Sequence, residues 1–203
     1  MKMKSIPSLL FPITIVVLLS ACSGNKNEES GSHADHKTDA SESKVPEASA
    51  PQFEAPKDFQ VQLGNVFAKY TALKDAFVDS DPDKVRSEAA STSQAVGQVD
   101  MKLLTGKAHD EWMAHLNPIS NALKEIGNSS DLESQREAFS ALSDNLYKSI
   151  KAFGLGGKEA FYEFCPMAFN NEGAYWLSDS EQIRNPYFGD KMLNCGVVKE
   201  KLQ

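Results

Sequence analysis

Apolar residues recur every three or four positions through four successive stretches of the chain, and this spacing limits the possible folds more than any other feature. The stretches cover residues 59–77, 82–104, 108–127 and 130–153. A period near 3.6 residues places the apolar side chains along one face of an α-helix. Amphipathic helices of similar length with short connections predict a mainly α fold, an antiparallel four-helix bundle.

Residues that favour helix ends flank these stretches. Asp81 and Pro82 predict the start of the second helix, because aspartate is a good cap and proline is tolerated in the first turn. Ser130 and Glu133 have the spacing of a capping box and predict the start of the fourth helix. Pro118 lies inside the third stretch and predicts a bend there.

The first residues have the layout of a secretory signal. Two lysines precede a mostly apolar segment, residues 6–19, and small residues then lead to Cys22. We therefore predict a signal peptide over residues 1–21. The Leu-Ser-Ala-Cys sequence resembles the bacterial lipobox, which implies that Cys22 receives acyl chains such as palmitate and anchors the protein to a membrane. The alternative is an ordinary secreted protein in which this cysteine is unmodified.

Residues 22–57 are rich in Ser, Glu, Asp, Lys, Ala and Pro, and contain a single aromatic residue, Phe53. Such a segment cannot bury enough apolar area to fold, so we predict a disordered tether. His33 and His36 in this tether could bind a metal weakly, but a solvated polar linker is the preferred interpretation. The folded domain is expected to cover residues 58–203.

The last part of the domain changes character. Glycines at residues 154–157 break the helical period, and the tail at about residues 158–203 is rich in aromatic residues, Cys and Met. Residues 161–164 and 174–177 predict two short strands around a turn at residues 170–173. Residues 197–202 could close the fold as a helix or a strand. The tail is too small for a core of its own, so we expect a small hairpin and loop cap packed on the bundle.

Both remaining cysteines lie in this tail, and each has a methionine close by in the sequence. Cys165 precedes Met167 by two positions, and Met192 precedes Cys195 by three. Two thiolates and two thioethers that converge would form a soft site, which selects Cu(I) or Ag(I). The alternative is a Cys165–Cys195 disulfide, which would close a loop of about 30 residues and stabilise the tail by about 3 kcal/mol. From spacing alone the disulfide is preferred, because exported chains usually pair their cysteines.

Three short motifs in this tail carry a resemblance to a known family: Cys165-Pro-Met-Ala, Asn185-Pro-Tyr-Phe-Gly and Met192-Leu-Asn-Cys-Gly. In this order they resemble an uncharacterised domain family found as small lipoproteins and fused to the C-terminus of periplasmic adaptors of copper and silver efflux pumps. The likeness covers about residues 59–203 and includes the Trp112-Met113 pair and the Gln135-to-Ser143 run. It implies a soft-metal site in preference to the disulfide, and an efflux adaptor as partner.

Residues other than these two cysteines and two methionines are weaker candidates for metal ligands. His109 and Met113 are four positions apart and share a helix face, and Trp112 beside them could lie over a bound cation. The preferred alternative is that Trp112 belongs to the core and His109 is exposed. In the tail, Arg184 could pair with Glu163.

Two further residues predict how the tail folds back. Asn185 should start a turn together with the following proline, and Gly189 can adopt a positive φ. That turn would return Met192 and Cys195 to the segment that contains Cys165.

Charge and motif content narrow the class of function. The formal net charge of −7 and the pI of about 5.1 argue against nucleic acid as a partner. We find no nucleophile elbow, phosphate loop or HExxH pattern, so we predict no enzymatic activity. We expect a lipid-anchored envelope protein, at the outer membrane or cell surface, that binds Cu(I) or Ag(I) for metal tolerance or for transfer to an efflux adaptor. The alternative is a disulfide-stapled structural domain that docks on an envelope partner without metal.

Overall fold

The computed structural model describes residues 45–47 and 50–203. The predicted signal peptide, the lipidation site Cys22, and His33 and His36 lie outside the described residues. Within the described part, none of the helices is long and apolar enough to cross a membrane.

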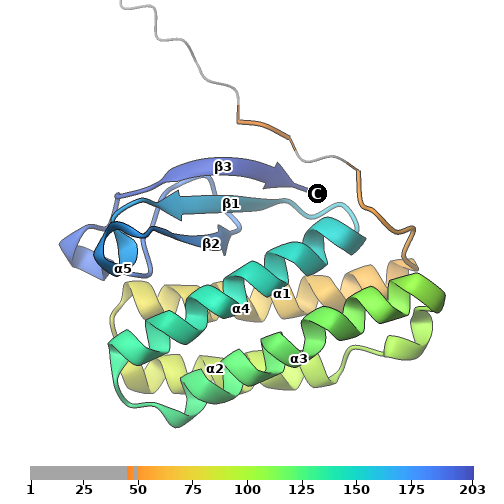
Figure 1. The fold of residues 1–203 in the computed structure, drawn as a ribbon, viewed down its shortest axis with the longest axis horizontal. Helices are drawn as coiled ribbons and strands as arrows, with labels where there is room; N and C mark the ends of the chain where they lie inside the picture. The colour runs from red at the N-terminus through yellow and green to blue at the C-terminus, as the bar shows by residue number, and fades with distance from the viewer. Residues whose placement is uncertain (1–44, 48–49) are drawn as a thin grey trace, which may run out of the picture. The chain divides into compact units, whose positions relative to one another are not determined.

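Four long helices make up most of the fold, so the predicted mainly helical class is confirmed (Figure 1). They are α1 (Lys57–Val78), α2 (Pro82–Gly97), α3 (Gly106–Asn128) and α4 (Leu132–Phe153). Helix α2 packs on α1 and α3, and α4 packs on α3 and α1. The order of packing follows the chain, as short connections between helices require.

The helix ends show which local predictions were correct. The side chain of Asp81 accepts hydrogen bonds from the backbone N–H groups of Asp83 and Lys84, both at 3.0 Å, so the predicted start of α2 is confirmed. The predicted capping box at Ser130 is wrong, because Asp131 caps α4 and accepts from Ser134 N–H at 2.9 Å. The predicted extension of the second helix to residue 104 is wrong, because α2 ends at Gly97, and Met101 and Leu103 belong to a short 3-10 helix, η1 (Met101–Leu103).

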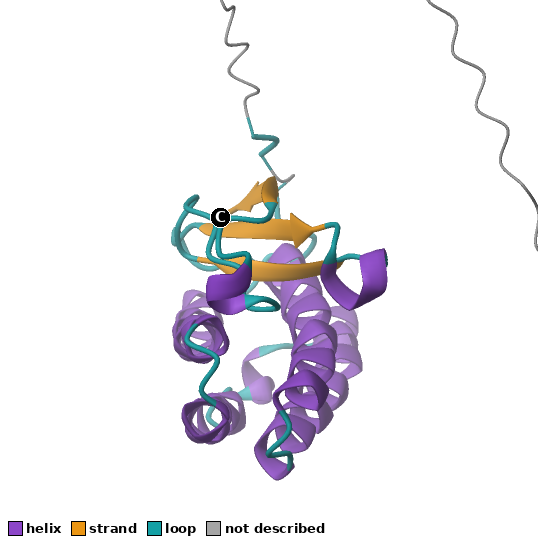
Figure 2. Cartoon of the chain, turned by 90° about the vertical axis from the view of Figure 1, so that its left-hand side faces the viewer, coloured by secondary structure: helices purple, strands orange, loops and turns teal. Residues whose placement is uncertain are grey.

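The tail forms a three-stranded antiparallel sheet of β1 (Ala160–Cys165), β2 (Ala174–Ser178) and β3 (Val197–Leu202) in the order β2-β1-β3. Both predicted strands of the hairpin are present, and the last segment is a strand rather than a helix. Between β1 and β2 lies the short α5 (Ala168–Asn171), and a 3-10 helix, η2 (Gly189–Lys191), precedes β3. Figure 2 shows this sheet on one side of the helices, and β2 is the strand that packs on α4 and α1.

The hydrophobic core is continuous from the helices into the tail. At one end of the helices, Trp112 packs on Phe59 and Phe153 with ring centroids 5.4 and 6.4 Å apart. Towards the other end, Phe139 of α4 lies 6.0 Å from the ring of Tyr187, which contacts Trp176 of β2 at the same distance. The tail is therefore packed into the same core as the helices.

Part of the segment predicted to be a tether contacts this domain. The carbonyl of Pro46 accepts a hydrogen bond from the N–H of Lys201 in β3, at 2.9 Å. Phe53 donates its backbone N–H to the carbonyl of Ala152, also at 2.9 Å, and its ring stacks on Phe153 at 5.6 Å. These residues lie along the edge of the sheet and the end of α4.

Candidate functional site

The structure brings the two cysteines of the tail together. Cys165 is the last residue of β1, and Cys195 lies two residues before β3, which pairs with β1. Their Sγ atoms are 3.3 Å apart, and both are free thiols. Cys165 is fully buried and Cys195 is half-buried. The hydrogen bond with Cys165, together with burial, raises the pKa of the Cys195 thiol above its ordinary value.

A turn that begins at Asn185 returns the chain to the first cysteine. The Oδ1 atom of Asn185 accepts the N–H of Tyr187 at 2.8 Å, and its Nδ2 atom donates to the carbonyl of Cys195 at 2.7 Å. Gly189 has a φ of 56°, and a Cβ there would lie 2.5 Å from Ser80 Oγ. Both features of the predicted turn are confirmed, and one buried amide side chain holds Cys195 in place.

Arg136 of α4 anchors the same turn from the helical side. Its guanidinium is almost completely buried and donates to the carbonyl of Pro186 at 3.0 Å, to Glu133 at 2.7 Å and to Ser80 Oγ at 3.1 Å. One side chain thus joins α4, the α1–α2 connection and the turn. A charge that is buried this deeply is stable only when such partners surround it.

Gly196 allows a close approach of the chain beside the thiols. A Cβ at this position would lie 2.8 Å from Cη2 of Trp176 and 3.2 Å from the carbonyl of Phe164. Gly196 follows Cys195 directly, so this close approach lies next to the thiols. The indole ring of Trp176 is fully buried and closes the site on the β2 side.

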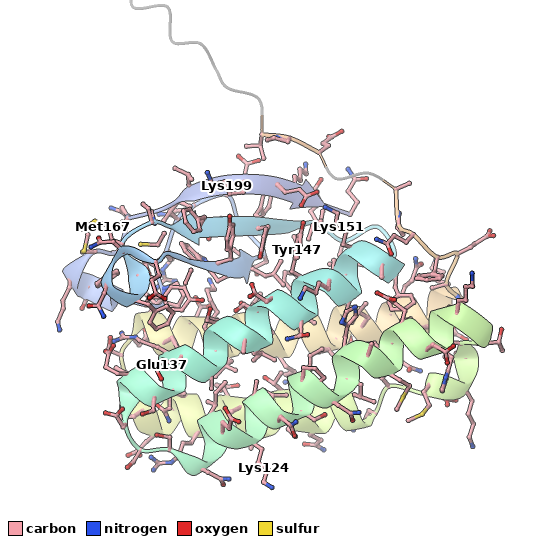
Figure 3. All side chains as sticks on the ribbon, in the orientation of Figure 1. Lys124, Glu137, Tyr147, Lys151, Met167 and Lys199 are labelled. Carbon is pink, nitrogen blue, oxygen red and sulfur yellow. The ribbon has the colours of Figure 1, made fainter. Side chains whose placement is uncertain are left out.

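The two methionines line one surface pocket, which neither cysteine lines. Met167 is 46% exposed and Met192 is half-buried. Both line a surface pocket of about 380 Å³, and neither cysteine lines it. The other lining residues are Glu133, Arg136, Glu137, Ala168, Phe169, Asn170, Tyr187 and Phe188. Figure 3 shows Met167 and Glu137 at the same end of the domain. The structure thus shows the two thiols in contact and both methionines at one pocket, and the four-sulfur site stays a prediction.

The lower-ranked candidates on α3 do not join this site. Trp112 is fully buried and packs on Phe59 and Phe153, which makes it a core residue. His109 and Met113 flank it near the start of α3, whereas α5 and the end of β1 lie at the opposite end of the helices (Figure 1). Within the described part of the chain, no cluster of three or more His, Cys, Asp or Glu side chains is placed to hold a metal ion.

Glu163 is a buried group near the thiols whose environment the sequence analysis missed. Its carboxylate is fully buried, and neither oxygen has a hydrogen-bond partner among the described residues. Burial raises the pKa of Glu163 to about 8. The predicted pair with Arg184 is wrong, because Arg184 lies 3.5 Å from Asp75 of α1. The alternation of Phe161, Glu163 and Cys165 along β1 was the signal that all three share one face of the sheet.

Comparisons with known proteins place the helical part in context. A family model described as "Protein of unknown function (DUF3347)" matches residues 66–158, from within α1 to just before β1. This match is consistent with the predicted resemblance to an uncharacterised domain family. The lipoprotein context and the fusion to efflux adaptors stay predictions. No curated protein and no solved structure matches the chain.

Proposed function

We propose that this chain is a lipid-anchored protein of the bacterial cell envelope that binds a soft monovalent metal ion, Cu(I) or Ag(I). The observation that carries the proposal is the pair of free thiols, Cys165 and Cys195, whose sulfur atoms are 3.3 Å apart. Thiolates are the ligands that Cu(I) prefers in proteins. The role is metal tolerance or transfer of the ion to an efflux adaptor, by binding rather than by catalysis.

The surroundings of the thiols suit an ion that needs few ligands. An ion held between two thiolates would separate the sulfurs by about 4.6 Å, taking metal–sulfur bonds of about 2.3 Å as a guide. Cys195 is half-buried and lies outside the strands, so a shift of its side chain is the simplest way to reach that separation. Cys165 is fixed at the end of the central strand. We assign Cys165 as the rigid ligand and Cys195 as the adjustable one.

The rest of the fold serves as a platform in this proposal. The four helices form the antiparallel bundle that supports the sheet, and Cys22 carries the lipid that holds the domain at the outer membrane or cell surface. The acidic net charge of −7 favours cations over nucleic acid as partners. The efflux adaptor as acceptor follows from the resemblance of the tail motifs.

An anaerobic Cu(I) titration of the reduced full chain in mild detergent tests the proposal. Cys22→Ser is present in every sample, so that Cys165 and Cys195 are the remaining thiols. We expect about one ion per chain, and loss of tight binding when Cys165→Ser and Cys195→Ser are combined. Met113→Leu, on the remote α3, is the matched control and should bind like the parent. Absence of binding by the reduced parent would contradict the proposal.

The same geometry favours a second candidate function, a disulfide-stapled domain that docks on an envelope partner without metal. Sulfurs 3.3 Å apart need only a small approach to reach the disulfide length of about 2.05 Å. In that reaction two S–H bonds break and one S–S bond forms, while two electrons and two protons pass to an oxidant such as a partner disulfide. Intact-mass measurement of protein isolated from the envelope decides: a loss of two hydrogens with unreactive thiols supports the staple, and intact thiols support the metal site.

A further inference from the structure

We propose that Met167 and Met192 form a separate capture site, open to solvent, from which the metal ion passes to the buried Cys165–Cys195 pair. This inference rests on the proposed function and adds a route to it. The two methionines share a pocket of about 380 Å³ that neither cysteine lines.

Two segments of the tail, one around Cys165 and one around Cys195, each carry one thiol and one thioether. Met167 lies two positions after Cys165, directly beyond Pro166, and is 46% exposed while the cysteine is fully buried. In the returning segment, Cys195 donates its N–H to the carbonyl of Met192 at 3.0 Å, so the two are joined by one tight turn. Each segment therefore contributes a thioether to the pocket and a thiol to the site next to it.

Backbone hydrogen bonding and aromatic packing support the turn that lines one side of the pocket. Phe169, Asn170 and Asn171 all have positive φ, a conformation that bulky residues rarely adopt without support from their surroundings. The support comes from Gly173 N–H, which donates to the carbonyl of Ala168 at 2.9 Å, and from the ring of Phe169, which packs edge-on to Tyr187 at 5.3 Å. A site built on such a turn is preorganised for a ligand.

The charges at the pocket favour a cation. Arg136 is the basic side chain among the lining residues, and its guanidinium is already engaged by Glu133, Pro186 and Ser80. Glu137 is exposed on α4 and adds a negative charge at the rim of the pocket. Thioethers bind soft ions without a charge of their own, so a nearby carboxylate strengthens the attraction.

The order of transfer follows from ligand strength. Neutral thioether sulfur is a weaker donor than thiolate, so an ion that first binds the exposed methionines gains free energy by moving inward to the cysteines, where the two thiols release their protons to water as the metal–sulfur bonds form. The exposed pocket thus controls how fast the ion enters, while the buried thiols control how tightly it is held.

Stopped-flow loading with Ag(I) separates the two roles, because Ag(I) does not oxidise thiols. The reduced full chain with Cys22→Ser is compared with the same chain that also carries Met167→Leu and Met192→Leu. Leucine keeps the apolar volume and removes the sulfur. We expect loading about tenfold slower or more, as is typical when a supporting group of a metal site is lost, with the final stoichiometry unchanged. Met101→Leu with Met113→Leu is the matched control.

A second measurement observes the pocket without the thiols. In a chain with Cys22→Ser, Cys165→Ser and Cys195→Ser, Ag(I) should shift the methyl NMR signals of Met167 and Met192 and leave that of Met113 in place. Unchanged methyl signals, or wild-type loading rates in the Met167→Leu, Met192→Leu chain, would overturn the capture site while Ag(I) binding by the parent still stood. If the parent itself bound no Ag(I), the proposed function would fall first.

Discussion

Helices α1 and α4 differ from α2 and α3 in what they bury. The first pair buries polar side chains that bond to other parts of the chain: Tyr70, Gln135, Arg136 and Ser143. Helices α2 and α3, which the structure describes completely, bury one polar side chain, Thr92, which donates to the carbonyl of Glu88 in its own helix at 2.8 Å. The buried polar side chains of the first pair make long-range contacts in addition to local ones, whereas that of the second pair makes only a local contact.

This difference separates the helices that help to build the sulfur site from the helices that contribute only to the core. Arg136 bonds to the turn before Cys195, and the hydroxyl of Tyr70 accepts the N–H of Leu177 in β2 at 3.1 Å. Both residues lie within the part of the chain that the family model matches, although the thiols lie outside it. The helices α1 and α4 thus hold the sheet and the sulfur site, whereas α2 and α3 complete the core.

The largest expected effect is a pH dependence of the free energy of unfolding that comes from Glu163 in β1. Below pH 4.5, Glu163 is protonated in both states. Between pH 4.5 and about 8 the unfolded chain releases the proton and the folded chain keeps it, so the free energy of unfolding falls as pH rises. The slope from this group approaches about 1.4 kcal/mol per pH unit and ends above pH 8. Glu163→Gln should remove this slope in urea unfolding measured from pH 5 to 8; an unaltered slope would contradict the assignment.

Trp112→Ala tests the other side of the comparison. The indole is fully buried against Phe59 and Phe153, so its loss should lower the free energy of unfolding by about 4 kcal/mol, the usual cost of such a cavity. Ag(I) stoichiometry should be unchanged as long as circular dichroism shows that the variant is folded. A folded Trp112→Ala protein that no longer binds Ag(I) would contradict the distinction between α1 and α4, which hold the sulfur site, and α2 and α3, which complete the core.

Arg136→Met should affect both stability and the site. It removes the bonds to Pro186 and Ser80 and the pair with Glu133, with an expected loss of about 3 kcal/mol. The turn at Asn185 would loosen, and Cys195 should react faster with a thiol reagent. Arg86→Ala is the matched control, because Arg86 pairs with Asp83 on the exposed face of α2 and its loss should cost less than about 0.5 kcal/mol. Equal thiol reactivity in both variants would show that the anchor does not control the site.

Tyr70→Phe should have the smallest effect of the four, about 1 to 2 kcal/mol in urea unfolding, because it leaves the buried N–H of Leu177 without its acceptor. Ser143 loses a partner at 2.6 Å but still donates to the carbonyl of Phe139. Tyr147→Phe, whose hydroxyl bonds Glu200 nearer the surface, is the comparison and should cost less. The reverse order would show that the polar link from α1 to β2 is not what holds the sheet.

The helices were predictable because their signals are local. The period of apolar residues and the Asp81 cap need no knowledge of distant contacts, and the strands on either side of the turn at Gly173 follow from composition. The cap of α4 was misplaced by one residue, since Ser130 and Asp131 are both good capping residues and only the direction of the chain decides between them. The early end of α2 at Gly97 likewise depends on how the next segment packs.

The site was predictable in part. The meeting of Cys165 and Cys195 followed from the turn at Asn185, and the structure places their sulfurs in contact. The pocket that Met167 and Met192 share could not be read from spacing, because its lining also needs Phe169 and Tyr187, which meet only in the folded chain. The burial of Glu163 depends on which face of β1 is covered, which is a tertiary property.

The contact of Pro46 with β3 bears on how copies of the protein behave in solution. An outer strand with free backbone groups is a template for pairing with a second chain. The carbonyl of Pro46 occupies one such group, the backbone N–H of Lys201. Proline has no N–H of its own, so it offers no donor for pairing with a further strand. A shortened form that starts at Asp58 loses this cover, and we expect it to self-associate in a concentration-dependent way.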